Sequence, residues 1–465
     1  MKSRLPVTGR IILLGILCGA VAGLPTRAGA GDGFQGLRVA QNQRYLERRE
    51  GDPFFYLGDT AWELFHRLDR EEADRYLKNR ADKGFTVIQA VVLAELDGLD
   101  HPNPYGYRPL ADKDPARPNE LYFQHVDYIV NRAESLGLVV GMLPTWGRWW
   151  KGQGIFTPEN ARTFGRFLGE RYKDKPIIWI LGGDHNPDTA RERGVIEEMA
   201  RGIKEGDGGR HLMTFHPRGP GLSSDYWHQA AWLDFNMFQS SHAARDHDNG
   251  LFTDHDYGLE PAKPTLDGEP RYEAIPVGFY NADADRDLRF DDYDVRQAAY
   301  WSLLAGACGH TYGNNNVWQM WQPGRKPVIW ASTPWQEALD HPGAAQMSHV
   351  RRLFESRPFH KLVPDPSMIL DGPTHGGAKI RAARATDGSF AFVYSPRGEP
   401  FTVRVNVIRT HRIRQTWFDP RTGAARNLHT TDTPGFQTFV PPSSGRGNDW
   451  ILVLDDATAG FPEVR

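Results

Sequence analysis

Two acidic residues are placed in a way that suits acid and nucleophilic chemistry on a glycosidic bond. Asp184 follows an apolar run and two glycines, and Glu269 stands near the end of the segment 263–270. Glycoside hydrolysis needs one carboxylic acid that protonates the leaving oxygen and a second carboxylate that attacks the anomeric carbon or activates water. Burial, or the charge of the second carboxylate, can keep the acid protonated near neutral pH. The same residues also fit a structural role, in which Asp184 caps the next helix and Glu269 pairs with Arg271.

Residues that can bind a sugar follow several other apolar runs. Aromatic rings stack on the apolar face of a sugar, and His, Gln and Asp form hydrogen bonds with its hydroxyl groups. We therefore expect a substrate pocket lined by Asp59, Trp62, Trp146, His185, His216, Gln239 and Trp318. Glu95 and His242 occupy similar positions without an assigned role. Packing in the core is an equally good interpretation for each Trp alone, and Trp149 and Trp150 form either an outer subsite or a cover over the barrel.

The elements that would position these residues are repeated βα units. Apolar runs alternate with helical patterns from about residue 34 to 360, and helix starts are marked by the capping pair Asp69 and Glu72 and by Thr157 before Pro158. The predicted strands are 54–57, 85–93, 138–144, 176–184, 211–217, 233–239, 263–270 and a last one near 308–313. Eight such strands predict an α/β protein with a (β/α)8 TIM barrel, whose active site lies at the carboxyl ends of the strands. A doubly wound open sheet is the alternative, although no GxGxxG follows the first strand.

The last hundred residues have a different pattern. After about residue 360, short segments of alternating polarity are separated by turn residues, which predicts a small all-β sandwich. We therefore expect a catalytic barrel over residues 31–360 and a C-terminal β-sandwich domain over residues 361–465. The aromatic residues of this domain mostly occupy alternating strand positions, which favours packing over glycan binding.

The first thirty residues have the pattern of a signal peptide. A basic start precedes the apolar run 11–24, and Ala28-Gly29-Ala30 is a small-residue cleavage site. We expect export to the periplasm or beyond the cell, with an uncleaved anchor as the alternative. Cleavage would remove four basic and no acidic residues, so the formal charge would change from −3 to −7. Of the two Cys, only Cys308 would remain, which predicts no intramolecular disulfide and a buried, apolar role for this thiol.

Composition and missing motifs exclude several other classes. The chain is 40% hydrophobic and 12% aromatic, so it is globular, and its mild negative charge gives no support to nucleic-acid binding. We predict no cofactor and no membrane span in the mature chain. The runs 246–248 and 254–256, both Asp-His-Asp, could bind a divalent metal, but a solvated loop or a substrate rim is favoured. No GxSxG supports a serine hydrolase, and the first strand lacks the His-x-His of metal-dependent barrel hydrolases.

Three motifs carry a family resemblance. GDTAW (58–62), PIIWILGGDHN (176–186) and LDGEPRYE (266–273) resemble the apiosidase-like glycoside hydrolases, grouped as glycoside hydrolase family 140. The resemblance covers roughly residues 34–455, and the C-terminal part is similar to a collagen-binding-type domain that often accompanies them. It implies a barrel in which Asp184 is the general acid/base and Glu269 the nucleophile of a retaining mechanism. Related retaining barrels commonly carry Asn-Glu where this chain has Gly183-Asp184.

The resemblance also implies a substrate. It points to apiose-bearing side chains of the plant pectin rhamnogalacturonan II, so the partner of the protein would be an oligo- or polysaccharide. The leading hypothesis is an exported glycosidase. The alternatives are a non-catalytic carbohydrate- or matrix-binding protein and a metal-dependent hydrolase.

Overall fold

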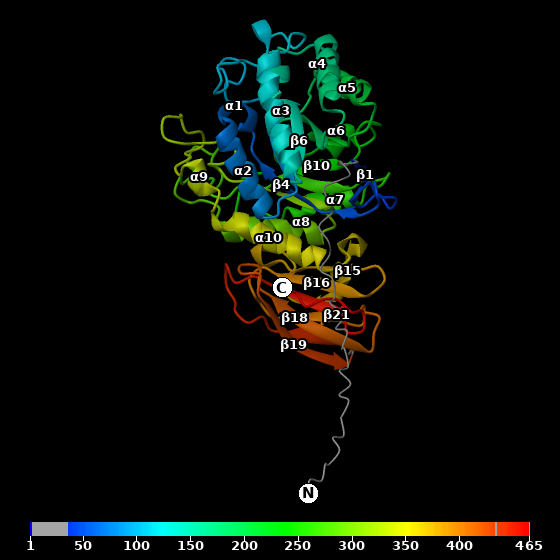
Figure 1. Ribbon diagram of the computed structural model, residues 1–465. Coiled ribbons are helices and arrows are strands. Elements are labelled where there is room, and N and C mark those ends of the chain that lie inside the picture. The colour runs from blue at the N-terminus through cyan, green and yellow to red at the C-terminus, as the bar shows by residue number, and fades with distance from the viewer. Residues whose placement is uncertain (2–35, 433–434, 465) are drawn as a thin grey trace.

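The computed structural model describes Met1 and residues 36–432 and 435–464, which form a helix-rich part and a β-rich part (Figure 1). Residues 2–30 of the predicted signal peptide lie outside the described residues. Among the described residues, no helix is both long and apolar enough to cross a membrane. A small antiparallel sheet precedes the first unit and consists of β1 (Leu37–Val39), β2 (Leu46–Arg48) and β3 (Pro53–Phe54).

A curled sheet of parallel strands forms the centre of the helix-rich part. The strands are β4 (Tyr56–Thr60), β5 (Val87–Leu93), β6 (Val139–Thr145), β7 (Ile177–Gly182), β8 (Met213–His216), β10 (Asn236–Gln239), β11 (Thr265–Glu269) and β12 (Gly309–Tyr312). Their order is β8-β7-β6-β5-β4-β12-β11-β10, with the short β9 (Gly221–Leu222) antiparallel to β10. The first strand, β4, pairs with the last, β12, so the sheet curls into the predicted barrel and is not a doubly wound open sheet.

The barrel closes differently between β8 and β10. No ladder joins these two strands among the described residues. Instead, the backbone N–H of Asp234 donates to Met213 O at 2.9 Å, and Thr214 Oγ1 donates to Phe235 O at 2.7 Å. This seam lies beside the strand ends that carry His216 and Gln239.

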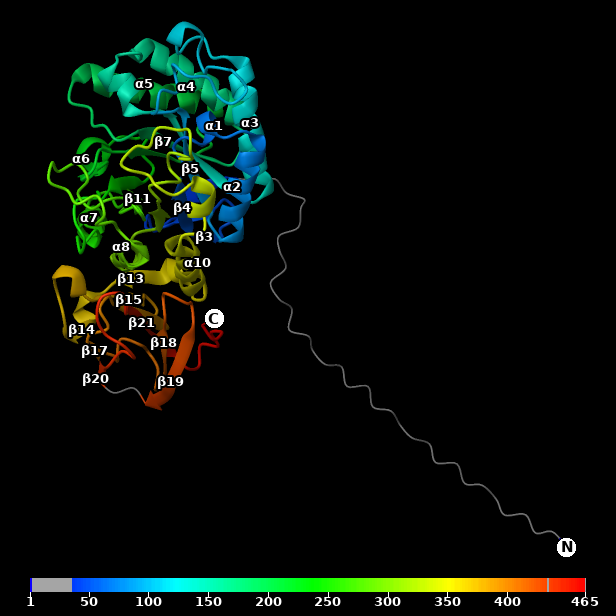
Figure 2. The ribbon, with the colours of Figure 1, turned by 90° about the vertical axis from the view of Figure 1, so that its left-hand side faces the viewer.

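Helices surround the sheet, as Figure 2 shows. They are α1 (Leu64–Arg67), α2 (Arg70–Asp82), α3 (Glu120–Ser135), α4 (Pro158–Tyr172), α5 (Ala190–Asp207), α6 (Ser224–Trp227), α7 (Gly250–Tyr257), α8 (Asp292–Leu304), α9 (Trp335–Ala338) and α10 (Pro342–Glu355), with the 3₁₀ turn η1 (Ala111–Lys113) and the π-helical turn η2 (Arg148–Gly152). The predicted helix starts are present: Asp69 and Glu72 form a capping box at α2, and Thr157 caps α4 before Pro158. These caps bind backbone N–H groups that would otherwise have no partner in the first turn.

The C-terminal part consists of two antiparallel sheets. The larger contains β13 (Leu362–Pro364), β15 (Arg381–Ala385), β16 (Phe390–Ser395), β21 (Trp450–Asp456), β18 (Arg412–Phe418) and β19 (Ala425–Asp432), in this order. The smaller contains β14 (Ile369–Asp371), β17 (Phe401–Arg404) and β20 (Phe436–Phe439), and the 3₁₀ turns are η3 (Phe359–Lys361), η4 (Pro366–Met368) and η5 (Gly376–Ala378). Residues of both sheets, among them Val403 and Leu452, share one buried apolar cluster.

The outer face of the larger sheet packs on α8 and α10, which lie between the barrel and the β-rich part in both views (Figures 1 and 2). The rings of Tyr300 and Tyr394 are 5.0 Å apart, and those of Phe354 and Phe392 are 5.5 Å apart. Burying one such ring stabilises a fold by about 1.5–3 kcal/mol relative to leaving it exposed. Separating the two parts would expose several of these rings, so the parts are joined by a real apolar core.

Candidate active site

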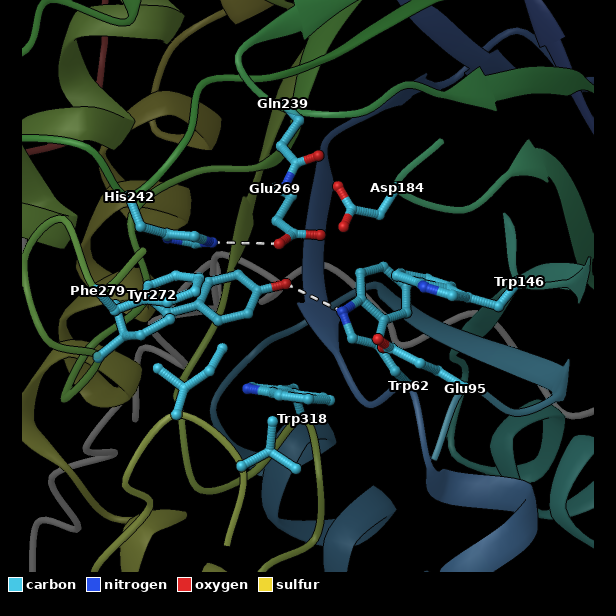
Figure 3. Close-up of a pocket in the computed structure, with 13 residues that line it drawn as sticks. Trp62, Glu95, Trp146, Asp184, Gln239, His242, Glu269, Tyr272, Phe279 and Trp318 are labelled. Atoms are coloured by element: carbon cyan, nitrogen blue, oxygen red, sulfur yellow. Dashed lines mark hydrogen bonds and ion pairs between the residues drawn. The ribbon is translucent and has the colours of Figure 1, made fainter. Parts of the chain in front are cut away.

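A cavity of about 120 Å³ opens at the carboxyl ends of the barrel strands, and both predicted acids point into it (Figure 3). Its walls are formed by Trp62, Glu95, Trp146, Asp184, Gln239, His242, Glu269, Tyr272, Ile275, Phe279, Trp318, Val328 and Ile329. Asp184 follows β7 and Glu269 ends β11, and the two carboxyl groups face each other across the cavity (Figure 3). The strand order therefore brings together two acids that are 85 residues apart in the chain.

The backbone before Asp184 makes an unusual turn. Gly182, Gly183 and Asp184 have φ values of +90°, +93° and +55°. A Cβ atom on Gly182 would lie 2.4 Å from the carbonyl oxygen of His216, and one on Gly183 would lie 2.9 Å from Cε3 of Trp146. Only glycine combines this left-handed backbone with such close neighbours. The glycine pair therefore sets where the Asp184 carboxyl stands.

Two histidines hold Glu269. His216 Nε2 lies 3.1 Å from Glu269 Oε2, and His242 Nε2 lies 3.2 Å from Glu269 Oε1. The backbone N–H of Asp184 donates to His216 Nδ1 at 3.3 Å. Because Nδ1 is turned toward this N–H group, Nε2 is the ring nitrogen that faces Glu269. One imidazole thus contacts the main chain of the first acid and the side chain of the second.

The two acids differ in protonation because their surroundings differ. Burial, followed by the charge of Glu269, raises the pKa of Asp184 to about 6. Burial also acts to raise the pKa of Glu269, but the hydrogen bonds and charges of His216 and His242 outweigh it and lower this pKa to about 2. Between these values Asp184 is an acid and Glu269 is a carboxylate.

Aromatic side chains form the wall around the acids. Trp62 Nε1 donates to Tyr272 Oη at 3.1 Å, and the rings of Trp62 and Trp146 are 5.3 Å apart. Trp318 is fixed by a hydrogen bond from Nε1 to Asn315 Oδ1 at 3.2 Å. These bonds hold the ring faces in place without occupying them, which leaves flat apolar surface for a sugar ring.

Two polar groups of the cavity are left for a ligand. Gln239 Oε1 is buried and has no hydrogen-bond partner among the described residues. Glu95 is a third carboxyl group in the wall, and its pKa is well above its usual range because of burial and of the charges of Asp184 and Glu63. A buried acceptor without a partner costs free energy, which a substrate hydroxyl group in this place would recover.

Of the seven predicted pocket residues, five lie at the cavity or directly behind it, and two lie elsewhere. Trp62, Trp146, Gln239 and Trp318 line the cavity, and His216 lies behind Glu269. Asp59 and His185 were expected in the pocket but do not line it. Asp59 is fully buried, accepting hydrogen bonds from Arg80 Nε at 2.7 Å and Tyr76 Oη at 2.5 Å.

His185 lies outside the cavity because the turn at Asp184 directs the next residue elsewhere. Its Nδ1 lies 3.3 Å from Gly183 O, and its ring lies 6.4 Å from that of Trp150. A strand end can aim one of two adjacent side chains into a barrel mouth, and here that residue is Asp184.

The same region shows which residues cap the next helix and bind Arg271. The next helix, α5, is capped by Thr189, not by Asp184, and Arg271 bonds to Gln297 at 3.3 Å, not to Glu269. Trp149 and Trp150 are fully buried and cover the barrel; they form no outer subsite. Among the described residues, no group of three or more His, Cys, Asp or Glu side chains is arranged to hold a metal.

Several wall residues were not predicted from the sequence. His242 and Glu95 stand after predicted strands. The sequence therefore indicates that they lie near the barrel mouth, but it does not indicate what they do there. Tyr272, Ile275 and Phe279 come from the loop after β11, and Val328 and Ile329 from the loop after β12. Apolar residues in long loops have no periodicity, so their place in the wall has no sequence signature.

Comparisons with known proteins cover nearly all of the chain. Residues 40–361 match the family described as "Apiosidase-like, catalytic domain", and residues 363–455 match "Putative collagen-binding domain of a collagenase". A solved structure described as "Glycoside hydrolase" is 35% identical, with 92% of this chain and 98% of that chain covered and a TM-score of 0.86. A glycoside hydrolase family 5 structure from Bacteroides vulgatus is 34% identical, with 92% and 94% covered and a TM-score of 0.85. A search of functionally curated proteins gives no significant match.

Similarity of this extent to two solved glycoside hydrolases, together with the facing acids in a barrel mouth, makes this protein a glycoside hydrolase. The family model covers well over half of the chain. The protein therefore belongs to the apiosidase-like family.

Proposed function

We propose that this protein hydrolyses a glycosidic bond with retention of configuration, with Asp184 as general acid/base and Glu269 as nucleophile. The observation that carries this proposal is the pair of facing carboxyl groups whose pKa values shift in opposite directions, to about 6 and about 2. Glycosidases of both the retaining and the inverting kind need one protonated and one ionised carboxyl group at the bond that breaks. The retaining form of the proposal is supported by the match to the apiosidase-like family.

The reaction has two displacements. The Glu269 carboxylate attacks the anomeric carbon while the bond to the leaving oxygen breaks, and Asp184 gives its proton to that oxygen. The product is a covalent ester between the sugar and Glu269. Asp184, now ionised, takes a proton from a water molecule whose oxygen attacks the anomeric carbon, which releases the sugar and restores both carboxyl groups.

The wall of the cavity supplies binding. The faces of Trp62, Trp146 and Trp318 stack on the sugar ring, while Gln239 and Glu95 form hydrogen bonds with its hydroxyl groups. His216 contacts the nucleophile and not the substrate. A cavity of about 120 Å³ suits a single sugar ring at the point of cleavage.

For the substrate, we propose an apiose-bearing side chain of rhamnogalacturonan II. The match to the apiosidase-like family over residues 40–361 supports this. A plant polysaccharide is met outside the cell, which agrees with export of the protein to the periplasm or beyond. The basic start, apolar run and small-residue site in residues 1–30 support export.

The test is incubation with rhamnogalacturonan II and with a panel of aryl glycosides, followed by identification of the released sugar and its first anomer by NMR. Release of apiose with the anomeric configuration of the substrate is expected. Release of the opposite anomer would show that water attacks the anomeric carbon directly and that no covalent ester forms. Release of another sugar would contradict the proposed substrate but not the proposed mechanism.

A further inference from the structure

The loop that connects β10 to α7, residues 240–249, links the active site to the C-terminal part of the protein. Its first half carries His242, whose Nε2 lies 3.2 Å from Glu269 Oε1. Its second half carries Asp246 and Asp248, the acidic residues of the first Asp-His-Asp run. The catalytic cavity does not use these two acids, and among the described residues they belong to no group of three or more possible metal ligands.

Asp246 is bound by the C-terminal part. Arg397 Nη2 donates to Asp246 Oδ2 at 2.7 Å. Gly377 lies directly against this carboxyl group, since a Cβ on Gly377 would be 2.2 Å from Asp246 Oδ1. A side chain at position 377 would collide with this carboxyl group, so the glycine leaves the room that Asp246 occupies against the β-rich part.

Asp248 is bound by two further cations of the same part. Lys379 Nζ lies 2.5 Å and Arg381 Nη2 lies 3.0 Å from Asp248 Oδ2. Arg381 Nη2 also donates to Asp254 Oδ2, in α7, at 2.9 Å. Arg381 and Asp248 are both buried. Removing one partner of a buried ion pair is strongly destabilising, because the remaining charge is left buried without a counter-ion.

The same loop is tied to the strand of the nucleophile. Ser240 Oγ and Asn249 Nδ2, at the two ends of the loop, both donate to Asp267 Oδ2, at 2.7 and 2.9 Å. Asp267 precedes Glu269 by two residues in β11. The cations of the β-rich part hold the second half of the loop, and His242, in the first half, is the residue that the loop presents to Glu269.

We infer that the C-terminal domain is a positioning element of the active site: Arg397, Lys379 and Arg381 hold the β10–α7 loop so that His242 stays in contact with Glu269. This inference rests on the proposed role of Glu269 as nucleophile. It gives the Asp-His-Asp run a function, as the acceptor of the domain's cations. It also gives the domain a role in catalysis that needs no ligand of its own.

The groups around Glu269 define what a displaced His242 would change. Glu269 faces His216 from β8, His242 from the loop, Tyr272 from its own segment, and the carboxyl groups of Asp184 and Glu95. The two imidazoles favour the ionised form of Glu269, while the two carboxyl groups disfavour it. Loss of the His242 contact therefore moves the protonation of Glu269 to higher pH.

The experiment uses the full chain with Arg397→Gln and, separately, Arg381→Gln. Hydrogen–deuterium exchange of residues 240–249 is measured first, because it does not depend on the catalytic assignment. Faster exchange of this loop is expected in both variants. With an aryl glycoside substrate, kcat should fall by on the order of 10- to 100-fold, since small misplacements at a site have effects of this size. The apparent pKa of the acidic limb of the pH profile should rise by about one pH unit.

Matched controls separate positioning from loss of stability. Arg421→Gln removes an ion pair of similar exposure within the domain, Arg421 Nε to Asp419 Oδ1 at 2.7 Å. Arg357→Gln removes a buried pair, Arg357 Nε to Asp455 Oδ1 at 2.7 Å, away from the loop. Unchanged loop exchange and kcat in a folded Arg397→Gln variant would overturn the inference, and so would an equal change in the controls. If Glu269→Gln keeps full activity, the proposed function fails, while the loop exchange still tests the link to the domain.

Discussion

His216 contacts Glu269 through Nε2, 3.1 Å from Oε2, while Nδ1 of the same ring accepts the backbone N–H of Asp184. A single side chain therefore sets the charge of one acid and the backbone position of the other. Removing the ring would disturb both acids together, so the effect of such a change could not be assigned to either acid alone.

Glu269→Gln should abolish turnover while leaving the fold intact. The amide has nearly the same shape as the carboxylate but cannot form the covalent ester. We expect kcat to fall by more than about 10³-fold. Thermal unfolding and circular dichroism verify the fold, and near-normal turnover would remove Glu269 from the role of nucleophile.

Asp184→Asn should reduce turnover in a manner that depends on the leaving group. A general acid contributes roughly 10²–10⁴-fold, and an aryl leaving group of low pKa needs less of its help in the first step. We expect a large loss of kcat/KM with the polysaccharide and a smaller one with activated aryl glycosides. Equal losses for both substrates would contradict the role of Asp184 as acid.

The activity should have a bell-shaped pH profile. The active form has Asp184 protonated, with its pKa at about 6, and Glu269 ionised, with its pKa at about 2. Activity is therefore lost as the pH rises through about 6 and lost again at the acidic end, and both limbs are properties of the coupled pair. Initial rates of kcat/KM against pH measure this, and the limb near 6 should disappear in Asp184→Asn.

Asp59→Asn should affect stability and not catalysis. The change leaves the buried Arg80 guanidinium without its counter-ion, which costs about 3–5 kcal/mol in comparable buried pairs. Denaturant unfolding should show this loss, while kcat of the folded variant stays near that of the wild type. A lower kcat at unchanged stability would instead return Asp59 to the substrate pocket.

Gly183→Ala should affect both stability and catalysis. The residue has a φ of +93°, and the new Cβ would meet Trp146 at 2.9 Å. We expect a loss of about 1–3 kcal/mol from backbone strain and a lower kcat from a displaced Asp184. Gly208→Ala is the control, because Gly208 has a φ of +67° but open space around its missing Cβ. Similar kcat losses in both variants would show that strain alone, and not the placement of Asp184, lowers activity.

Much of the fold follows from local patterns. Every barrel strand is short and fully buried, and β5 and β7 in particular are apolar runs. Capping residues such as Thr157 mark the helix starts. The elements that the sequence did not predict are short or exposed. For example, β19 (Ala425–Asp432) is mostly solvent-exposed and polar, so it has no apolar alternation to reveal it.

The sequence predicts the site residues that stand at strand ends, but not those that long loops bring to the cavity. Asp184, Gln239 and Trp146 reach the cavity because each stands at the end of its strand or within two residues after it. Asp59 also lies near the end of its strand, but Arg80 of α2 binds it in the core, which only tertiary structure shows. Ile329 has a φ of +49°, a conformation rare for a β-branched residue, and no local preference predicts the loop that brings it to the wall.

The seam between β8 and β10 gives the two sides of the barrel mouth different mechanical properties. Paired strands such as β5 and β6 keep a fixed spacing, because each change would stretch a row of hydrogen bonds. At the seam, one backbone–backbone bond, the Thr214 hydroxyl group and the bond from the Met213 N–H group to Asp234 Oδ2 span the gap, so the strand ends that carry His216 and Gln239 are joined by fewer bonds than a ladder would supply. The wall of the barrel mouth at the β8–β10 seam is therefore easier to deform than the wall formed by β5 and β6.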